Sequence, residues 1–409
     1  MKGGQKMICQ VNLDTIQLAD SLIRPVARVT PVLESTRLSQ KIGVPVWLKL
    51  ENLQRTGSFK IRGAFYKLNQ LAESGQVKQV MAISAGNHAQ GVALAGSLTG
   101  INSTIFMPAD APLAKVQATR NYGAEVICIG KSFDETREHA MEWLEQNPVT
   151  FISPFDDDDI IAGQGTCGLE IFQQVPEVET VVVPVGGGGL LSGIALALKQ
   201  LKPSIRLIGV QARASSSLYQ SFQRKKLILA PSAPTIADGI AIKKPAQRNF
   251  EVLRQYVDEM VLVSEEELSD ALYFAIQYKH LIAEGAGVAG LAALLSGKIA
   301  SQGPTLVVLS GGNIDVKLLD SIINKGMMRG GRFLTFKTLI ADSPGSLKKV
   351  LNLLALQKSN VLHIEHARFR SDIPLGTTEI EVEIETRDHT HASEIVAALE
   401  DKGYHVQRL

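Results

Sequence analysis

The first three quarters of the chain alternate short runs of apolar, β-branched residues with longer amphipathic stretches. Alternating strand and helix patterns predict an open, largely parallel α/β sheet with helices on both faces. The apolar runs at 180–185 and 305–312 are typical of strands that are buried on both sides. Strands are predicted at 44–51, 80–84, 103–108, 125–130, 180–185, 206–211 and 305–312, and helices at 86–100, 111–123 and 134–146.

The pattern changes after about residue 325. Residues 326–333 are rich in glycine and basic residues, which favours a linker. The stretch 334–409 then reads strand, helix, strand, strand, helix, strand, and residues 377–386 alternate strictly between apolar and polar. This order predicts a ferredoxin-like domain with an antiparallel sheet, separate from a first domain over 1–325.

The composition is that of a soluble globular protein, with 45% hydrophobic and 20% charged residues among 409. The 42 basic and 41 acidic side chains give a net charge of +1, so we expect neither nucleic acid nor a membrane surface as a partner. The three cysteines are widely spaced and indicate neither a disulfide framework nor a zinc site. The N-terminal stretch has no apolar signal core, and we expect a cytoplasmic protein.

Four consecutive glycines, Gly186 to Gly189, lie between an apolar strand and an apolar helix. Glycines let the backbone approach a ligand, and the start of a helix offers free N–H groups. This combination predicts a phosphate cradle. A flexible linker is the alternative, and the buried elements on either side disfavour it. The loop has neither a Walker lysine nor the pattern of a dinucleotide site, so we expect the phosphate on a smaller molecule.

Other predicted strands are also followed by polar loops. Ser84 and Asn87 in SAGNHAQG could hold a carboxylate or simply cap a helix, and SGGN follows the strand at 305–309. In open α/β sheets, ligands bind at the carboxyl ends of strands, which favours the functional interpretation. Glu284 could be only a helix-start charge, and the acidic run 156–159 is interpreted as a helix cap and solvated loop rather than a metal site.

The stretch TGSFKIRGA places Lys60 beside Phe59 and near two glycines. A lone lysine at a helix start is usually solvated. Together with a phosphate cradle and a carboxylate loop, however, it indicates a pyridoxal-phosphate enzyme acting on amino acids, in which the lysine forms the Schiff base.

The motifs SFKIRGA, SAGNHAQG, AGQGT, VPVGGGGLLSG and SGGN span roughly residues 25–325. In these motifs the chain resembles the fold-type II pyridoxal-phosphate enzymes, and among them the threonine dehydratases (threonine ammonia-lyases). The resemblance implies a tryptophan synthase β-like fold of two open α/β subdomains, the smaller at about 52–150. The tail, with DSPGSL at 342–347, resembles an ACT regulatory domain.

The resemblance also implies roles for the motif residues. Lys60 would bind the cofactor and later remove the Cα proton of the substrate, with Phe59 near the cofactor ring. Asn87 would hydrogen-bond the ring hydroxyl, Ser310 would meet the pyridine nitrogen, and Glu284 would line the pocket. The phosphate would be bound by Gly186, Gly187, Gly188, Gly189 and Leu190, and the substrate carboxylate by Ser84, Ala85, Gly86, Asn87 and His88, with Asp238 and Gly239 flanking the site.

The implied reaction is β-elimination from L-threonine to 2-oxobutanoate and ammonia, the first committed step toward isoleucine, and also from L-serine to pyruvate. The related serine racemases carry a serine where this chain has Ala85 and an acidic metal site near Gln211, so racemisation is disfavoured and no metal is expected. An L-serine dehydratase, a cysteine synthase-like enzyme and a non-catalytic amino-acid sensor stay open. A homo-oligomer, dimer or tetramer, and an effector such as isoleucine at the tail are also implied.

Overall fold

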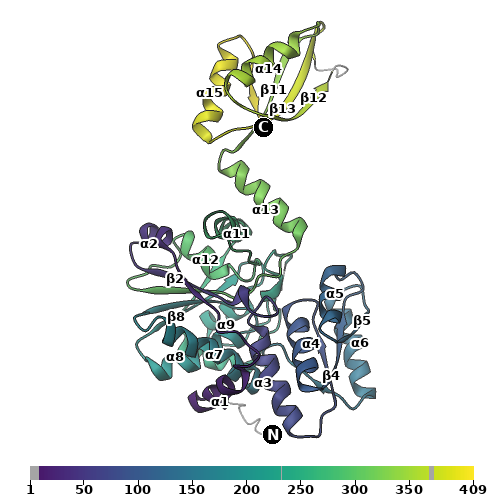
Figure 1. The fold of residues 1–409 in the computed structure, drawn as a ribbon, viewed down its shortest axis with the longest axis vertical. Helices are drawn as coiled ribbons and strands as arrows, with labels where there is room; N and C mark the ends of the chain where they lie inside the picture. The colour runs from purple at the N-terminus through teal and green to yellow at the C-terminus, as the bar shows by residue number, and fades with distance from the viewer. Residues whose placement is uncertain (1–8, 232, 368–372) are drawn as a thin grey trace. The chain divides into compact units, whose positions relative to one another are not determined.

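The computed structural model describes residues 9–231, 233–367 and 373–409. The chain divides into two compact units, Met1–Ile314 and Asp315–Leu409 (Figure 1). The first unit contains two sheets and the second contains one.

The larger sheet has six strands in the order β1-β2-β10-β7-β8-β9. β1 is antiparallel to β2, and the other neighbours are parallel. Every residue of β7 and β10 is buried, because α8 and α12 lie on opposite sides of this sheet (Figure 1). The strands are β1 (Val32–Glu34), β2 (Val46–Leu50), β7 (Thr180–Pro184), β8 (Arg206–Ala212), β9 (Glu259–Val263) and β10 (Thr305–Leu309).

The smaller sheet has four parallel strands in the order β5-β4-β3-β6. They are β3 (Gln79–Ile83), β4 (Asn102–Met107), β5 (Glu125–Cys128) and β6 (Thr150–Phe151), so this sheet lies within the stretch expected for the smaller subdomain. The alternation predicted from the sequence is therefore confirmed, and it forms two open sheets, as the family resemblance implied.

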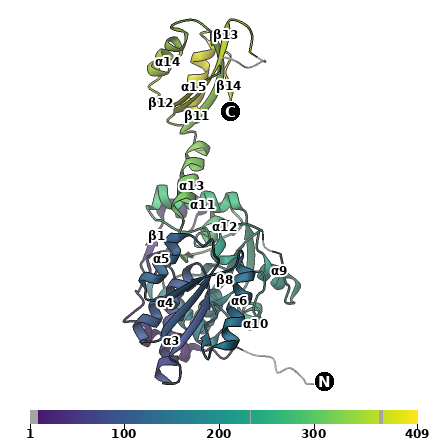
Figure 2. The same cartoon turned by 90° about the vertical axis from the view of Figure 1, so that its right-hand side faces the viewer.

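The helices of the first unit fill the connections between strands, and short 3-10 turns lie at Glu51–Leu53 and Asp238–Ile240. α3 and α4 pack against each other and α3 also contacts α7, which brings the smaller sheet against the larger part of the unit (Figure 2). The helices are α1 (Leu13–Ile23), α2 (Thr36–Ile42), α3 (Lys60–Glu73), α4 (Asn87–Thr99), α5 (Leu113–Asn121), α6 (Phe133–Gln146), α7 (Asp158–Gln174), α8 (Gly189–Leu201), α9 (Ser217–Arg224), α10 (Gln247–Tyr256), α11 (Glu265–Lys279) and α12 (Ala289–Leu295).

The second unit has the predicted ferredoxin-like topology. Its antiparallel sheet has the order β12-β13-β11-β14, so β13 lies between the two strands that α14 connects. Alternate residues of β11 and β13 are buried against α14 and α15, and for β13 the period of two predicted this burial. The elements are β11 (Phe333–Ala341), α14 (Ser346–Leu356), β12 (Val361–Ala367), β13 (Thr377–Glu385), α15 (His389–Glu400) and β14 (Gln407–Arg408); the end of the strand predicted after Ala367 lies outside the described residues.

The linker predicted over 326–333 is wrong in its first half, because α13 spans Val316–Arg329. The side chain of Asp315 caps the start of this helix, and Gly326 is buried, so the helix continues through the glycine. The chain leaves the helix only at Gly330 and Gly331, the latter with φ of +65°. A single glycine within an apolar helical pattern therefore weakens a helix without ending it.

Among the described residues, no helix combines the length and the apolar character that a membrane-spanning segment requires.

Candidate active site

The loop that leads into α3 is held by the SGGN turn that follows β10. Ser58 forms an isolated antiparallel bridge with Gly311, and the amide of Phe59 donates to the carbonyl of Ser310 at 3.2 Å. Two motifs about 250 residues apart are therefore hydrogen-bonded at the carboxyl end of the larger sheet, where ligands of such sheets bind.

Lys60 is the first residue of α3, and its Nζ donates to the carbonyl oxygen of Pro154 at 2.8 Å. The same nitrogen lies 5.1 Å from the centre of the Phe59 ring. Burial lowers the pKa of Lys60 to about 8, although the carboxylate of Glu284 acts in the opposite direction. A lysine with such a pKa is a stronger nucleophile near neutral pH than a solvated one.

Glu284 is buried and accepts a hydrogen bond from Asn87 Nδ2 at 2.6 Å. Burial and the Asp238 carboxylate raise the pKa of Glu284 to about 7, while Asn87 lowers it. Two groups with pKa values displaced toward neutrality thus lie in one site, an arrangement typical of functional centres.

The loop between β3 and α4 brings the predicted carboxylate-binding residues together. Ser84 Oγ accepts from the amide of Gly86 at 3.2 Å, and no side chain caps the start of α4 at Gly86. His88 is buried, its Nε2 lies 3.0 Å from the carbonyl of Ile152, and burial together with Lys60 lowers its pKa to about 3. The imidazole is therefore neutral and its Nε2 donates to the carbonyl of Ile152, so the His88 ring is not a donor for a ligand of this loop.

The four glycines of the loop before α8 have separate structural reasons. Gly188 has φ of +93°, which favours glycine, and a Cβ at Gly186 would lie 3.0 Å from Ile240 Cα. A Cβ at Gly187 would overlap the ring of Phe155, and one at Gly189 would lie 3.1 Å from the backbone of the same residue. The sequence predicted that these glycines let the backbone approach a phosphate. In the structure, Gly187 and Gly189 also leave room for Phe155.

Asn249 holds this glycine loop in place. Its Nδ2 donates to the carbonyls of Gly187 and Phe155, each at 2.9 Å. No side chain caps α8, whose first residues are Gly189 and Leu190. Free amides at the positive end of a 13-residue helix fit a phosphate, and the amine of Lys60 fits the aldehyde of the same cofactor.

The remaining predicted residues lie around Glu284. A Cβ at Gly239 would be 3.7 Å from Glu284 Oε1, and Gly311 approaches the same carboxylate. Ser310 is buried beside Gly311. Asp238 is exposed and pairs with Lys115 at 3.1 Å, so it lies at the rim.

Three residues of the site were missed by sequence reasoning: Asn313, Phe155 and Asn249. Asn313 was within SGGN but received no role, although its Nδ2 donates to both Asn87 and Thr56. Phe155 and Asn249 belong to no motif, and nothing in their local sequence pattern indicates contact with the glycine loop.

The acidic run before α7 is structural, as interpreted from the sequence. Asp157 caps α7, and the run pairs with Lys67 and Arg248. Gln211 hydrogen-bonds the carbonyl of Gly186 at 3.4 Å and the amide of Tyr219 at 2.7 Å. In the part of the chain that is described, no group of three His, Cys, Asp or Glu residues could bind a metal ion.

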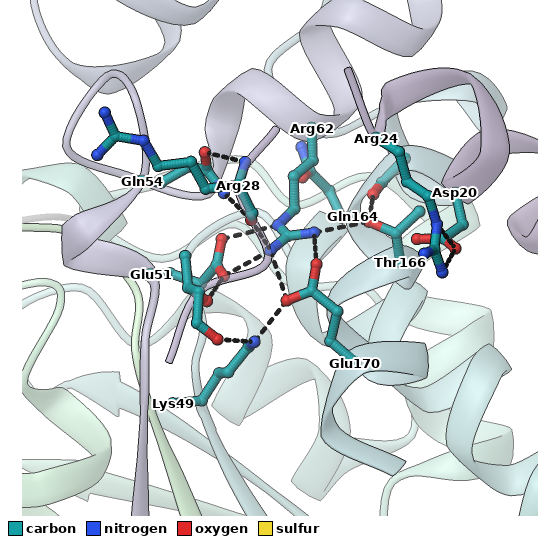
Figure 3. Close-up of polar contacts among 12 residues, drawn as sticks. Asp20, Arg24, Arg28, Lys49, Glu51, Gln54, Arg62, Gln164, Thr166 and Glu170 are labelled. Atoms are coloured by element: carbon teal, nitrogen blue, oxygen red, sulfur yellow. Dashed lines mark hydrogen bonds and ion pairs between the residues drawn. The ribbon is translucent and has the colours of Figure 1, made fainter. Parts of the chain in front are cut away.

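A buried ionic cluster lies behind the start of α3 (Figure 3). The guanidinium of Arg62 pairs with Glu51 and Glu170, each at 2.7 Å, and Lys49 also bonds Glu170. Burial raises the pKa of Glu51, but the Arg62 guanidinium lowers it by more, so this pKa lies below its usual value. Two cations and two carboxylates balance each other, and they join β2, α3 and α7 two residues away from Lys60.

The lysine, the glycine loop and the polar loops fit a pyridoxal-phosphate site. The chain belongs to the family of pyridoxal-phosphate-dependent enzymes, whose family model matches residues 23–311. Over 397 residues it is 46% identical to the L-threonine ammonia-lyase of Thermotoga maritima, covering 97% of this chain and 99% of that one. The processed form of threonine deaminase isoform 2 from Solanum lycopersicum superposes with a TM-score of 0.73 at 32% identity, covering 80% of this chain and 93% of that one. Maize serine racemase superposes with a TM-score of 0.73 at 34% identity, covering 78% and 98%.

Proposed function

We propose that the protein is an L-threonine ammonia-lyase, which forms 2-oxobutanoate and ammonia from L-threonine and pyruvate and ammonia from L-serine. The observation that carries the proposal is the buried amine of Lys60, which bonds the carbonyl of Pro154, the residue before the Phe155 ring that packs on Gly187. Similarity to a threonine ammonia-lyase over nearly the whole chain supports this reaction.

In this proposal Lys60 holds the cofactor and moves the Cα proton. The amides of Gly186 to Gly189 and Leu190 bind the cofactor phosphate, and Phe59 lies near the ring. The bound cofactor supplies an electron sink for the negative charge at Cα. Ser310 would meet the ring nitrogen with a neutral hydroxyl, which would make a weaker electron sink than a carboxylate and would favour prompt loss of the β-hydroxyl.

The substrate carboxylate is assigned to the loop Ser84, Ala85, Gly86, Asn87 and His88. The uncapped start of α4 supports this assignment, because a carboxylate would replace the missing cap. The ring of His88 is already bonded to Ile152, so His88 contributes its backbone N–H rather than a titrating imidazole. Glu284 lines the pocket near Gly239.

The test is keto-acid release by the purified protein loaded with pyridoxal phosphate. We expect 2-oxobutanoate from L-threonine, and none from Lys60→Ala. Pyruvate from L-serine without product from threonine would indicate an L-serine dehydratase. Product formed only with an added thiol nucleophile would indicate a β-replacing enzyme, and a protein that binds amino acids without turnover would be a sensor.

We also assign the second unit as an ACT domain that binds an amino-acid effector, with isoleucine as the first candidate. Its ferredoxin-like topology and the turn before α14 support this assignment. A cavity of about 320 Å³ lies in this unit, lined by Met327, Arg332, Phe333, Lys358, Asn360, Glu385, Thr386, Arg387 and His391. Threonine kinetics that do not change at saturating L-isoleucine would remove isoleucine as the effector.

A homo-oligomer is part of the proposal. β12 is at the edge of its sheet and its residues are largely exposed, so it can pair with another copy. Sedimentation velocity on the purified protein separates monomer, dimer and tetramer. A cytoplasmic location is supported by the free thiols of Cys9, Cys128 and Cys167.

A further inference from the structure

Three polar side chains form a continuous line of hydrogen bonds across the candidate site. Asn313 Nδ2 donates to the carbonyl oxygen of Thr56 at 2.8 Å and to Asn87 Oδ1 at 2.7 Å. Asn87 Nδ2 donates in turn to Glu284 Oε1 at 2.6 Å. The line joins the loop before α3, the SGGN turn, the start of α4 and the segment before α12.

The direction of these bonds follows from one backbone carbonyl. The oxygen of Thr56 can only accept, so the amide group of Asn313 must present its nitrogen there. The second N–H on that nitrogen points to Asn87, which must therefore present its oxygen. The NH₂ group of Asn87 is then directed toward Glu284, and the order of donors and acceptors needs no assumption about the amide orientations.

Close packing holds Asn313 in this orientation. A Cβ on Gly57 would overlap the Asn313 side chain, and the amide of Gly312 donates to the carbonyl of Gly57 at 2.8 Å. On the other side, a Cβ on Gly311 would overlap Glu284 and lie 3.1 Å from Asn87 Nδ2. The three side chains therefore pack directly against the backbone of the two glycines, Gly57 and Gly311.

We propose that Asn313 is a positioning residue that keeps the side-chain nitrogen of Asn87 directed toward the cofactor site. An amide nitrogen has two N–H groups, and Glu284 uses one of them. The second is available for the ring hydroxyl of the cofactor. This inference rests on the proposed role of Asn87 in cofactor binding; it adds that the role depends on the orientation that Asn313 gives to the Asn87 amide.

The variant Asn313→Asp tests the proposal because it keeps the size of the side chain and replaces the donor by an acceptor. Oxygen would then face both Thr56 and Asn87, so the Asn87 amide would turn over and present its own oxygen to the cofactor. We expect the dissociation constant of pyridoxal phosphate to rise about tenfold or more, and the visible absorption band of the bound cofactor to shift. Asn121→Asp, the same change at an exposed position on α5, is the matched control.

A double-mutant cycle separates positioning from a general structural effect. If Asn313 acts through Asn87, Asn313→Asp should weaken cofactor binding much less in an Asn87→Ala background than in the original chain. Equal losses in both backgrounds, or a cofactor affinity and spectrum unchanged by Asn313→Asp, would overturn the proposal. If Asn313→Asp does not fold by circular dichroism, Asn313→Ser, which retains a single donor, enters the same cycle.

These measurements use cofactor binding and absorption, without any substrate. The cofactor measurements can therefore be interpreted even if the assigned reaction is wrong. Conversely, a double-mutant cycle without coupling would not contradict the proposed reaction.

Discussion

The Nζ atom of Lys60 and the carbonyl oxygen of Pro154 are 2.8 Å apart. The residue after Pro154 is Phe155, whose ring packs on Gly187 of the glycine loop. The amine of Lys60 and the glycine loop are thus connected through two adjacent residues that belong to neither motif. A displacement of this short segment would change both ends of the cofactor site.

The rate of cofactor loading should depend on pH with a midpoint near the pKa of Lys60. Only the neutral amine attacks the aldehyde, so the rate at which apoprotein gains its visible band should increase with pH and level off above about pH 8. Since the Glu284 carboxylate raises the pKa of Lys60, the midpoint should fall in Glu284→Gln. Nα-acetyl-lysine is the reference, with a midpoint near about 10.4. An identical midpoint for both proteins would contradict the coupling.

Gly187→Ala should weaken cofactor binding, because the new methyl group overlaps the ring of Phe155 and must displace the loop or the ring. We expect a loss of affinity of about tenfold or more for pyridoxal phosphate. Adding Phe155→Ala should restore part of it, since the space is then free. Gly330→Ala, where a Cβ meets only ordinary contacts at 3.4 Å, is the control. An unchanged affinity for pyridoxal phosphate in Gly187→Ala would contradict the prediction and show that the loop can move without weakening cofactor binding.

Arg62→Met should strongly destabilise the first unit. The substitution leaves Glu51 and Glu170 buried with one remaining cation, Lys49, and breaking a buried pair in this way costs about 3–5 kcal/mol. The urea midpoint of the apoprotein should fall accordingly. Arg62→Lys should not restore it, because an ammonium cannot bridge two carboxylates as a guanidinium does. Lys243→Met, which removes an exposed pair with Asp134, should leave the midpoint nearly unchanged.

Ala85→Ser should introduce racemisation. Ala85 lies in the loop between β3 and α4 and is partly buried. The resemblance to serine racemases implies a serine at this position in those enzymes. A hydroxyl there provides a second proton donor for Cα. We expect D-serine to form from L-serine in the variant and little in the original chain, as measured by chiral chromatography. Equal D-serine formation in the two proteins would contradict the prediction, because residue 85 would then not control racemisation.

The elements of the fold were largely predictable because each carries its own periodic signal. The buried strands β7 and β10 and the alternating strand β13 are readable from local pattern alone. The extent of α13 could not be predicted from the sequence. The glycines at its end suggested a linker, whereas the structure shows a helix that Asp315 caps and in which Gly326 is buried.

The candidate site was predictable where residues occur in loops at strand ends, and less so where the site depends on tertiary contacts. Lys60 and Asn87 were found in this way, Glu284 only through the family resemblance, and the structure brings them together. The position of Phe155 on the glycine loop and the burial of Arg62 depend on residues about 30 and 100 positions away, respectively. Sequence periodicity carries no record of such distances.

The hydrogen-bonded line through Asn313 ends very near the boundary between the two units. Only Ile314 separates Asn313 from Asp315, whose side chain caps α13. A single residue therefore separates the last side chain of this line from the residue that caps the start of α13. The first residue of the second unit is thus two positions along the chain from the amide group that we propose orients Asn87.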